Sequence, residues 1–130
     1  MSLTLKARRV GDVVILDFGG RLTLGHPTFL LRELLRDYLQ NGDRKFVFNL
    51  GETSYMDSAG LGALIAGFTS AQSQGGKVIL LNLTARVEGI LQLTKLATVF
   101  DTFKDEAAAL AYFQQDIPDK GSTRKTQAPS

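Results

Sequence analysis

The spacing of hydrophobic and polar residues near the amino end of the chain predicts a β-hairpin. Apolar and polar side chains alternate with a period of two over residues 3–7, which is typical of a half-exposed edge strand. A Gly-Asp turn signal follows at residues 11–12, and residues 13–18 form an almost continuous apolar run. The glycine pair at residues 19–20 is predicted to end this second strand.

Two short apolar runs without alternation predict strands that are covered on both faces. They span residues 46–50 and 78–81. Such runs are typical of the interior of a parallel sheet, because helices then pack on each side. Val99-Phe100 is predicted as a short last strand.

Four segments have the spacing and end signals of helices. The first is predicted to begin at His26-Pro27, where a first-turn proline needs no N–H donor, and to stop at the Asn-Gly pair 41–42. A second is predicted over residues 58–74, before a Gly-Gly pair. A third runs over residues 84–93 with threonine as its N-cap, and an alanine-rich fourth covers residues 105–113.

The resulting order, β-β-α-β-α-β-α-β-α, predicts a single α/β domain. Strands that alternate with helices imply a mostly parallel sheet with right-handed crossovers. We expect about five strands, the first of them antiparallel, and about four helices. The domain is predicted over residues 1–117. Residues 118–130 lack large apolar side chains, so they are predicted to be a disordered basic tail.

Composition and charge fit a globular domain that binds no nucleic acid directly. Hydrophobic residues make up 44% of the 130 residues and charged residues 22%. The net charge of +2 arises entirely in residues 118–130, which leaves 12 basic and 12 acidic residues in the domain. A nucleic-acid binder usually carries a basic face on its domain, and a formally neutral body argues against that class.

Several kinds of chemistry are excluded by residue type. The chain has no cysteine, which excludes disulfides and thiolate sites, and its single histidine, His26, cannot form a histidine metal cluster. No signal peptide is recognisable, and no apolar run approaches the ~20 residues of a membrane-spanning helix, so a cytoplasmic protein without membrane contact is expected.

The most informative segment is Tyr55-Met56-Asp57-Ser58-Ala59-Gly60-Leu61-Gly62, at a predicted strand-to-helix junction. Loops at the carboxyl ends of parallel strands are where α/β proteins place their sites. The first N–H groups of a helix lack partners within it, and the helix dipole favours negative charge there. Asp57 or Ser58 can cap these groups, and a phosphate on Ser58 would accept the same donors.

The helix that follows has one stripe of small residues and one of bulky residues. The small stripe contains Gly60, Ala63, Gly67 and Ala71, and the bulky stripe beside it should face the core. Gly60 and Gly62 each weaken a helix by roughly 1 kcal/mol relative to alanine. Close approach of another backbone, inside the fold or from a partner, is one reason to tolerate them.

Two other interpretations of this segment remain open. In the first, Asp57 and Ser58 do no more than cap the helix, which is a common use of such residues. In the second, Ser58 is a hydrolase nucleophile. The Gly-x-Ser-x-Gly elbow fails at Met56, however, and His26 precedes the serine rather than following it. No phosphate-binding loop with a Gly-Lys-Ser/Thr ending is present.

Residues 56–62, following the apolar strand 46–50, resemble the signature of STAS domains, the sulphate transporter and anti-sigma factor antagonist domains. The resemblance covers about residues 3–114. It implies a regulatory protein, not an enzyme, that binds an anti-sigma factor with serine kinase activity. It also implies that ATP belongs to the partner and that this chain has no cofactor. Phosphorylation of Ser58 would end the complex, a serine phosphatase would reset it, and sigma-factor-dependent transcription would be regulated.

The same resemblance implies partner contacts around the switch serine. The residues implied are Asp57, Ser58, Ala59, Gly60, Gly62, Arg21 and Thr23. The chain departs from the family pattern at Arg21 and Thr23, where many members have acidic residues, and this leaves the identity of the particular partner open. The alternative function is a non-switching STAS scaffold in a lipid-transport or stress-signalling complex, in which Ser58 only caps a helix.

Overall fold

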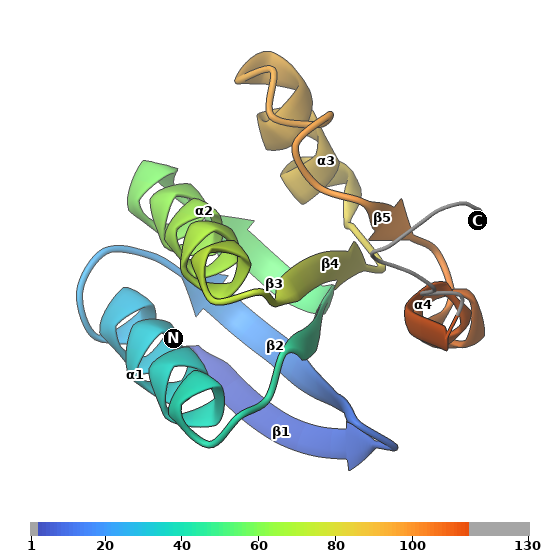
Figure 1. The fold of residues 1–130 in the computed structure, drawn as a ribbon. Helices are drawn as coiled ribbons and strands as arrows, with labels where there is room; N and C mark the ends of the chain where they lie inside the picture. Colours follow the sequence, from blue (N-terminus) through green and yellow to red (C-terminus); the bar gives the residue numbers. More distant parts are fainter. Residues whose placement is uncertain (1–2, 115–130) are drawn as a thin grey trace.

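The computed structural model describes residues 3–114, which form one five-stranded sheet and four helices (Figure 1). The strands lie in the order β1-β2-β3-β4-β5. They are β1 Thr4–Val10, β2 Val13–Leu22, β3 Lys45–Met56, β4 Lys77–Leu81 and β5 Thr102–Phe103. The tail predicted over residues 118–130 and the last three residues of the predicted domain lie outside the described residues.

The strand directions confirm the predicted architecture. β1 pairs with β2 in antiparallel register from Thr4–Gly19 to Val10–Val13, and every other pair of neighbouring strands is parallel. A hairpin turn at residues 11–12 connects the antiparallel pair, and Gly11 takes the positive φ of 61° that this turn requires. The remaining strands are joined by helical crossovers, as in other α/β domains.

Strands β2 and β3 extend beyond the predicted ends. The glycine pair 19–20 does not stop β2, because β3 continues to pair with it as far as Leu22–Met56. β3 gains two residues relative to β2 through register shifts after Asp17 and after Gly20. Such bulges bend a strand and re-aim its end. They carry the end of β3 to the junction with the second helix.

The predicted strand at Val99-Phe100 is wrong. Val99 lies in a turn closed by the hydrogen bond from its N–H to the carbonyl of Leu96, and the strand is Thr102–Phe103 instead. Phe100 is buried and meets the ring of Phe68 edge-on at 5.3 Å. Its apolar character therefore reflects core packing and not strand formation.

The helices cover the two faces of the sheet unequally. They are α1 His26–Gln40, α2 Ser58–Ser73, α3 Ala85–Leu93 and α4 Glu106–Gln114. Helices α1, α2 and α3 contribute to the larger hydrophobic cluster, whereas α4 alone joins the smaller cluster on the opposite side (Figure 1). The N-caps include the predicted Thr84, whose hydroxyl accepts from the N–H of Val87 at 3.2 Å.

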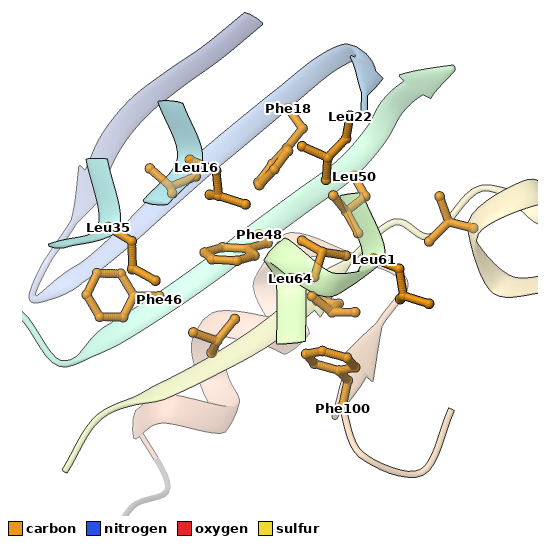
Figure 2. Packing of buried hydrophobic residues seen from close by; sticks show 14 of the residues in the cluster. Leu16, Phe18, Leu22, Leu35, Phe46, Phe48, Leu50, Leu61, Leu64 and Phe100 are labelled. Carbon is orange, nitrogen blue, oxygen red and sulfur yellow. The ribbon is translucent and has the colours of Figure 1, made fainter. Parts of the chain in front are cut away.

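Alternate side chains of the central strand fill both clusters, as the continuous apolar run predicts. Phe46, Phe48 and Leu50 point into the larger cluster, and Val47 points into the smaller one. Figure 2 shows Phe48 in the middle of the larger cluster, between the sheet and α2. Its ring lies 5.3 Å from that of Phe18, and both side chains are almost fully buried. This cluster supports the helix whose first residue is Ser58.

Candidate functional site

The junction between β3 and α2 is held by the carboxylate of Asp57, which is the N-cap of α2. Asp57 Oδ1 accepts a hydrogen bond from the N–H of Gly60 at 2.8 Å, and Oδ2 accepts from the N–H of Leu24 at 3.1 Å. The N–H of Asp57 donates in turn to the carbonyl of Leu22 at 3.3 Å. One carboxylate therefore caps the helix and ties it to the loop that follows β2.

Ser58 is the first residue of α2 and is exposed. Because Asp57 is the N-cap, capping requires nothing of the Ser58 hydroxyl. Within residues 3–114, no hydrogen bond joins this hydroxyl to a histidine, so the Ser–His pair of a serine hydrolase is not formed here. The arrangement presents an unengaged hydroxyl at the positive end of a 16-residue helix.

The small residues of α2 serve packing inside the fold. A Cβ on Gly60 would lie 2.1 Å from the carbonyl oxygen of Leu22, and one on Gly67 would lie 3.0 Å from the Leu35 side chain. Gly62, in contrast, has open space around it. The close backbone approach predicted from the glycines is therefore real at Gly60 and is made to β2.

Electrostatics at the junction favour negative charge. Hydrogen bonds from the N–H groups of Gly60 and Leu24 hold the pKa of Asp57 below its usual value. The helix dipole, and first-turn amides of α2 that have no partner within the helix, would act on a phosphate attached to the neighbouring residue. Ser58 is therefore an exposed residue at the positive end of the α2 dipole.

Replacing Asp57 with alanine is expected to lower the free energy of unfolding by about 1 kcal/mol at pH 7, the usual value of an N-cap. Because the pKa of Asp57 is depressed in the folded state, its ionised form stabilises the fold above the unfolded-state pKa of about 3.9. That contribution is lost as the pH falls through the folded-state pKa. Urea unfolding of both proteins between pH 3 and pH 7 measures the change.

Asp57→Asn is the matched control, since asparagine caps a helix without a charge. The stability gap between wild type and Asp57→Asn should be largest near neutral pH and should close toward pH 3. A gap that stays constant over this range would show that the Asp57 charge does not stabilise the junction.

The other residues predicted to contact a partner surround this junction at different depths. Arg21 and Gly62 are exposed, Thr23 and Ala59 are half-buried, and Gly60 is buried beneath the turn. Gly60 therefore affects the shape of the site through the close packing of α2 on β2, and not through an exposed surface of its own.

Two further features of this edge were not predicted from the sequence. The guanidinium carbon of Arg21 lies 4.4 Å from the centre of the Tyr55 ring, and that of Arg86 lies 5.6 Å from it. Exposed cation–π contacts of this kind contribute about 0.5–1 kcal/mol each.

The second feature is a pair of exposed large apolar side chains. Leu24 is 77% exposed and Phe29 is 54% exposed. The sequence shows that each of these residues is basic or apolar. It does not show that the two arginines meet on Tyr55, because that depends on the register of β2 on β3 and on the position of α3.

Two kinds of feature are absent from the part of the chain that the structure describes: a metal-binding cluster and a membrane-spanning helix. Within residues 3–114, no group of three or more histidine, aspartate or glutamate side chains is arranged to hold a metal ion. None of the helices found there has both the length and the apolar character needed to cross a bilayer.

The fold and the site define a class of α/β domain: a mostly parallel sheet with an antiparallel first strand, and an exposed serine that begins the second helix. A family model described as STAS domain matches residues 4–109. The chain therefore belongs to the STAS domain family, which confirms the resemblance seen in its sequence.

Relatives and solved structures agree with this assignment. The chain is 26% identical over 101 residues to the anti-sigma-B factor antagonist of Bacillus subtilis, covering 78% of this chain and 91% of that protein. The unphosphorylated form of the anti-sigma factor antagonist SpoIIAA superposes with a TM-score of 0.67 at 19% identity, covering 87% of this chain and all of the other. A sulfate transporter family protein from Wolinella succinogenes gives 0.70 at 21% identity, covering 81% and 87%. The two structural matches show a shared fold.

Proposed function

We propose that this protein is an anti-sigma factor antagonist whose switch is phosphorylation of Ser58. The unmodified chain binds an anti-sigma factor that is also a serine kinase, and the phosphorylated chain is released. A serine phosphatase then restores the binding form. The observation that carries the proposal is the exposed, unengaged hydroxyl of Ser58 at the first position of α2.

The comparisons support the general role. The Bacillus subtilis relative is named an anti-sigma-B factor antagonist. SpoIIAA, which has the same fold, is known in an unphosphorylated and a phosphorylated form, and they match this chain with TM-scores of 0.67 and 0.69. One fold thus accommodates both states in that protein. By analogy, we propose that modification of this chain acts at its surface and leaves the sheet unchanged.

The proposed role needs no catalysis by this chain. In it, the partner supplies ATP and the kinase site, and Ser58 is a substrate. The phosphate adds ~ −1.5 to −2 charges at pH 7 in the middle of a packed interface. A cost of only ~1.4 kcal/mol there weakens binding tenfold. Regulation of sigma-factor-dependent transcription in the cytoplasm follows from this role.

The test combines the purified chain with its anti-sigma factor and ATP, followed by intact-mass and peptide mass spectrometry. We expect one phosphate, on Ser58, and none in Ser58→Ala. The matched control is Ser54→Ala, which removes an exposed serine from β3 and should leave phosphorylation unchanged. Ser58→Asp is expected to bind the anti-sigma factor at least tenfold more weakly than wild type.

Phosphate on another residue, or equal affinity of Ser58→Asp and wild type, would contradict the switch. The N-cap of α2 is Asp57 and not Ser58, which argues against the alternative in which Ser58 only caps a helix. That alternative is a non-switching STAS scaffold. In that case Ser58 would remain unmodified, and Ser58→Asp would keep all of its interactions.

A further inference from the structure

Two arginines meet on one tyrosine ring at the carboxyl edge of the sheet. Arg21 comes from β2, Tyr55 from β3 and Arg86 from the first turn of α3. Their guanidinium carbons lie 4.4 and 5.6 Å from the ring centre, so they are no more than about 10 Å apart. Three separate elements therefore place two positive charges together, and these residues are called the Arg21–Tyr55–Arg86 cluster below.

Both arginines are exposed and free to bind an anion. Among the residues that the structure describes, neither guanidinium has a carboxylate within 4.0 Å. Arg8 and Arg9, in contrast, are each held by carboxylates at 2.6 Å. Stacking on Tyr55 limits the motion of the two guanidinium groups and leaves their N–H donors without acidic partners.

The cluster lies close to the proposed switch. Arg21 is opposite Tyr55 in the parallel register, and Leu22 is opposite Met56 at the end of β3. Ser58 follows Tyr55 by three positions, with only two residues between them, so their Cα atoms are within about 11 Å. A protein that covers Ser58 would also cover the cluster, because stable interfaces bury about 800 Å² on each partner.

Apolar side chains border the other side of the junction. Leu24 is 77% exposed although its N–H is fixed to the Asp57 carboxylate at 3.1 Å, and Phe29 is 54% exposed in the first turns of α1. Exposed apolar side chains and unpaired arginines on one edge of a domain are typical of protein interfaces, which are enriched in aromatic residues and arginine. Nucleic-acid sites usually need a wider basic face, and residues 1–117 carry equal numbers of acids and bases.

We infer that the Arg21–Tyr55–Arg86 cluster binds carboxylates on an acidic patch of the anti-sigma factor, and so selects the partner. The inference rests on the proposed function. It also explains release: a phosphate on Ser58 would face the same carboxylates, and two negative groups in one interface repel each other. The cations that attract the partner and the phosphate that expels it thus act on one acidic surface.

The test measures the affinity, association rate and salt dependence of binding to the anti-sigma factor that phosphorylates Ser58. Arg21→Glu/Arg86→Glu is expected to raise Kd at least tenfold, mainly by slower association, and to weaken the dependence on NaCl. Arg21→Lys/Arg86→Lys keeps the charges and should stay within threefold. Lys6→Glu/Lys104→Glu is the matched control, because it changes the net charge by the same amount. Lys6 is exposed on β1 and Lys104 is exposed directly after β5, and the Kd of this variant should stay within twofold of wild type.

Thermal unfolding of each variant confirms that the fold is intact before binding is compared. Equal affinity of wild type and Arg21→Glu/Arg86→Glu, with Ser58 still phosphorylated, would overturn the inference and leave the proposed function standing. Absence of both binding and Ser58 phosphorylation in wild type would overturn both. Micromolar binding of a 20-nucleotide RNA or DNA duplex that the double variant loses would assign the cluster to nucleic acid and also overturn the inference.

Discussion

Gly60→Ala is expected to lower the free energy of unfolding by about 3 kcal/mol, the upper end of the usual cost of overpacking. The added Cβ would stand 2.1 Å from the carbonyl oxygen of Leu22 and 2.9 Å from its carbon. A backbone group cannot rotate away as a flexible side chain can, so β2 and α2 must separate. Urea unfolding followed by circular dichroism measures the loss.

Gly62→Ala provides the matched control two residues away. Apart from its chain neighbours and the backbone of its own helix, no atom lies within 4 Å of the position that its Cβ would take, and Gly62 is exposed in the second turn of α2. Alanine there should raise stability by up to about 1 kcal/mol, because it favours the helix over glycine. Similar effects of the two substitutions would contradict a specific contact between Gly60 and Leu22.

Phe48→Ala is expected to cost about 4 kcal/mol, within the range for a fully buried phenylalanine. Phe48 has no exposed surface, and it packs on Phe18 under α2 (Figure 2). Its removal leaves a cavity that the rigid sheet cannot close. The measurement is the midpoint of urea unfolding at constant m-value.

Phe29→Ala removes the same side chain from a position that is 54% exposed. Its effect on the free energy of unfolding should stay within about 0.5 kcal/mol, the usual range for surface substitutions. If Phe48→Ala were equally mild, the larger hydrophobic cluster would not be the principal support of α2.

The order of elements and the direction of the strands were predictable because hydrophobic periodicity reports burial directly. The run 46–50 without alternation predicted a strand covered on both faces, and the structure confirms it through Phe48 and Val47. Proline at the start of α1 predicted the helix start for a local steric reason.

Strand ends and the last strand were harder to predict because they depend on distant partners. Gly19 and Gly20 act locally as strand breakers, but pairing with β3 carries β2 on to Leu22. Phe100 has the apolar character of a strand residue but packs beside Phe68 from a turn.

At the site, the local chemistry was predictable and its surroundings were not. A cap by Asp57 or Ser58 follows from sequence position alone, and the structure selects Asp57. The proximity of Arg86 to Tyr55 joins residues 31 positions apart, and no local rule relates them.

The way in which the Asp57 junction is fixed has a consequence for evolution. Its geometry depends on a carboxylate, two backbone amides and the missing side chain of Gly60. None of these belongs to Arg21, Leu24 or Arg86 as a side chain, so those three positions can diverge while the turn keeps its shape. Gene duplicates of such a domain could therefore acquire separate partners in one cell by a few surface substitutions, and cross-talk between parallel signalling routes would be avoided without redesign of the scaffold.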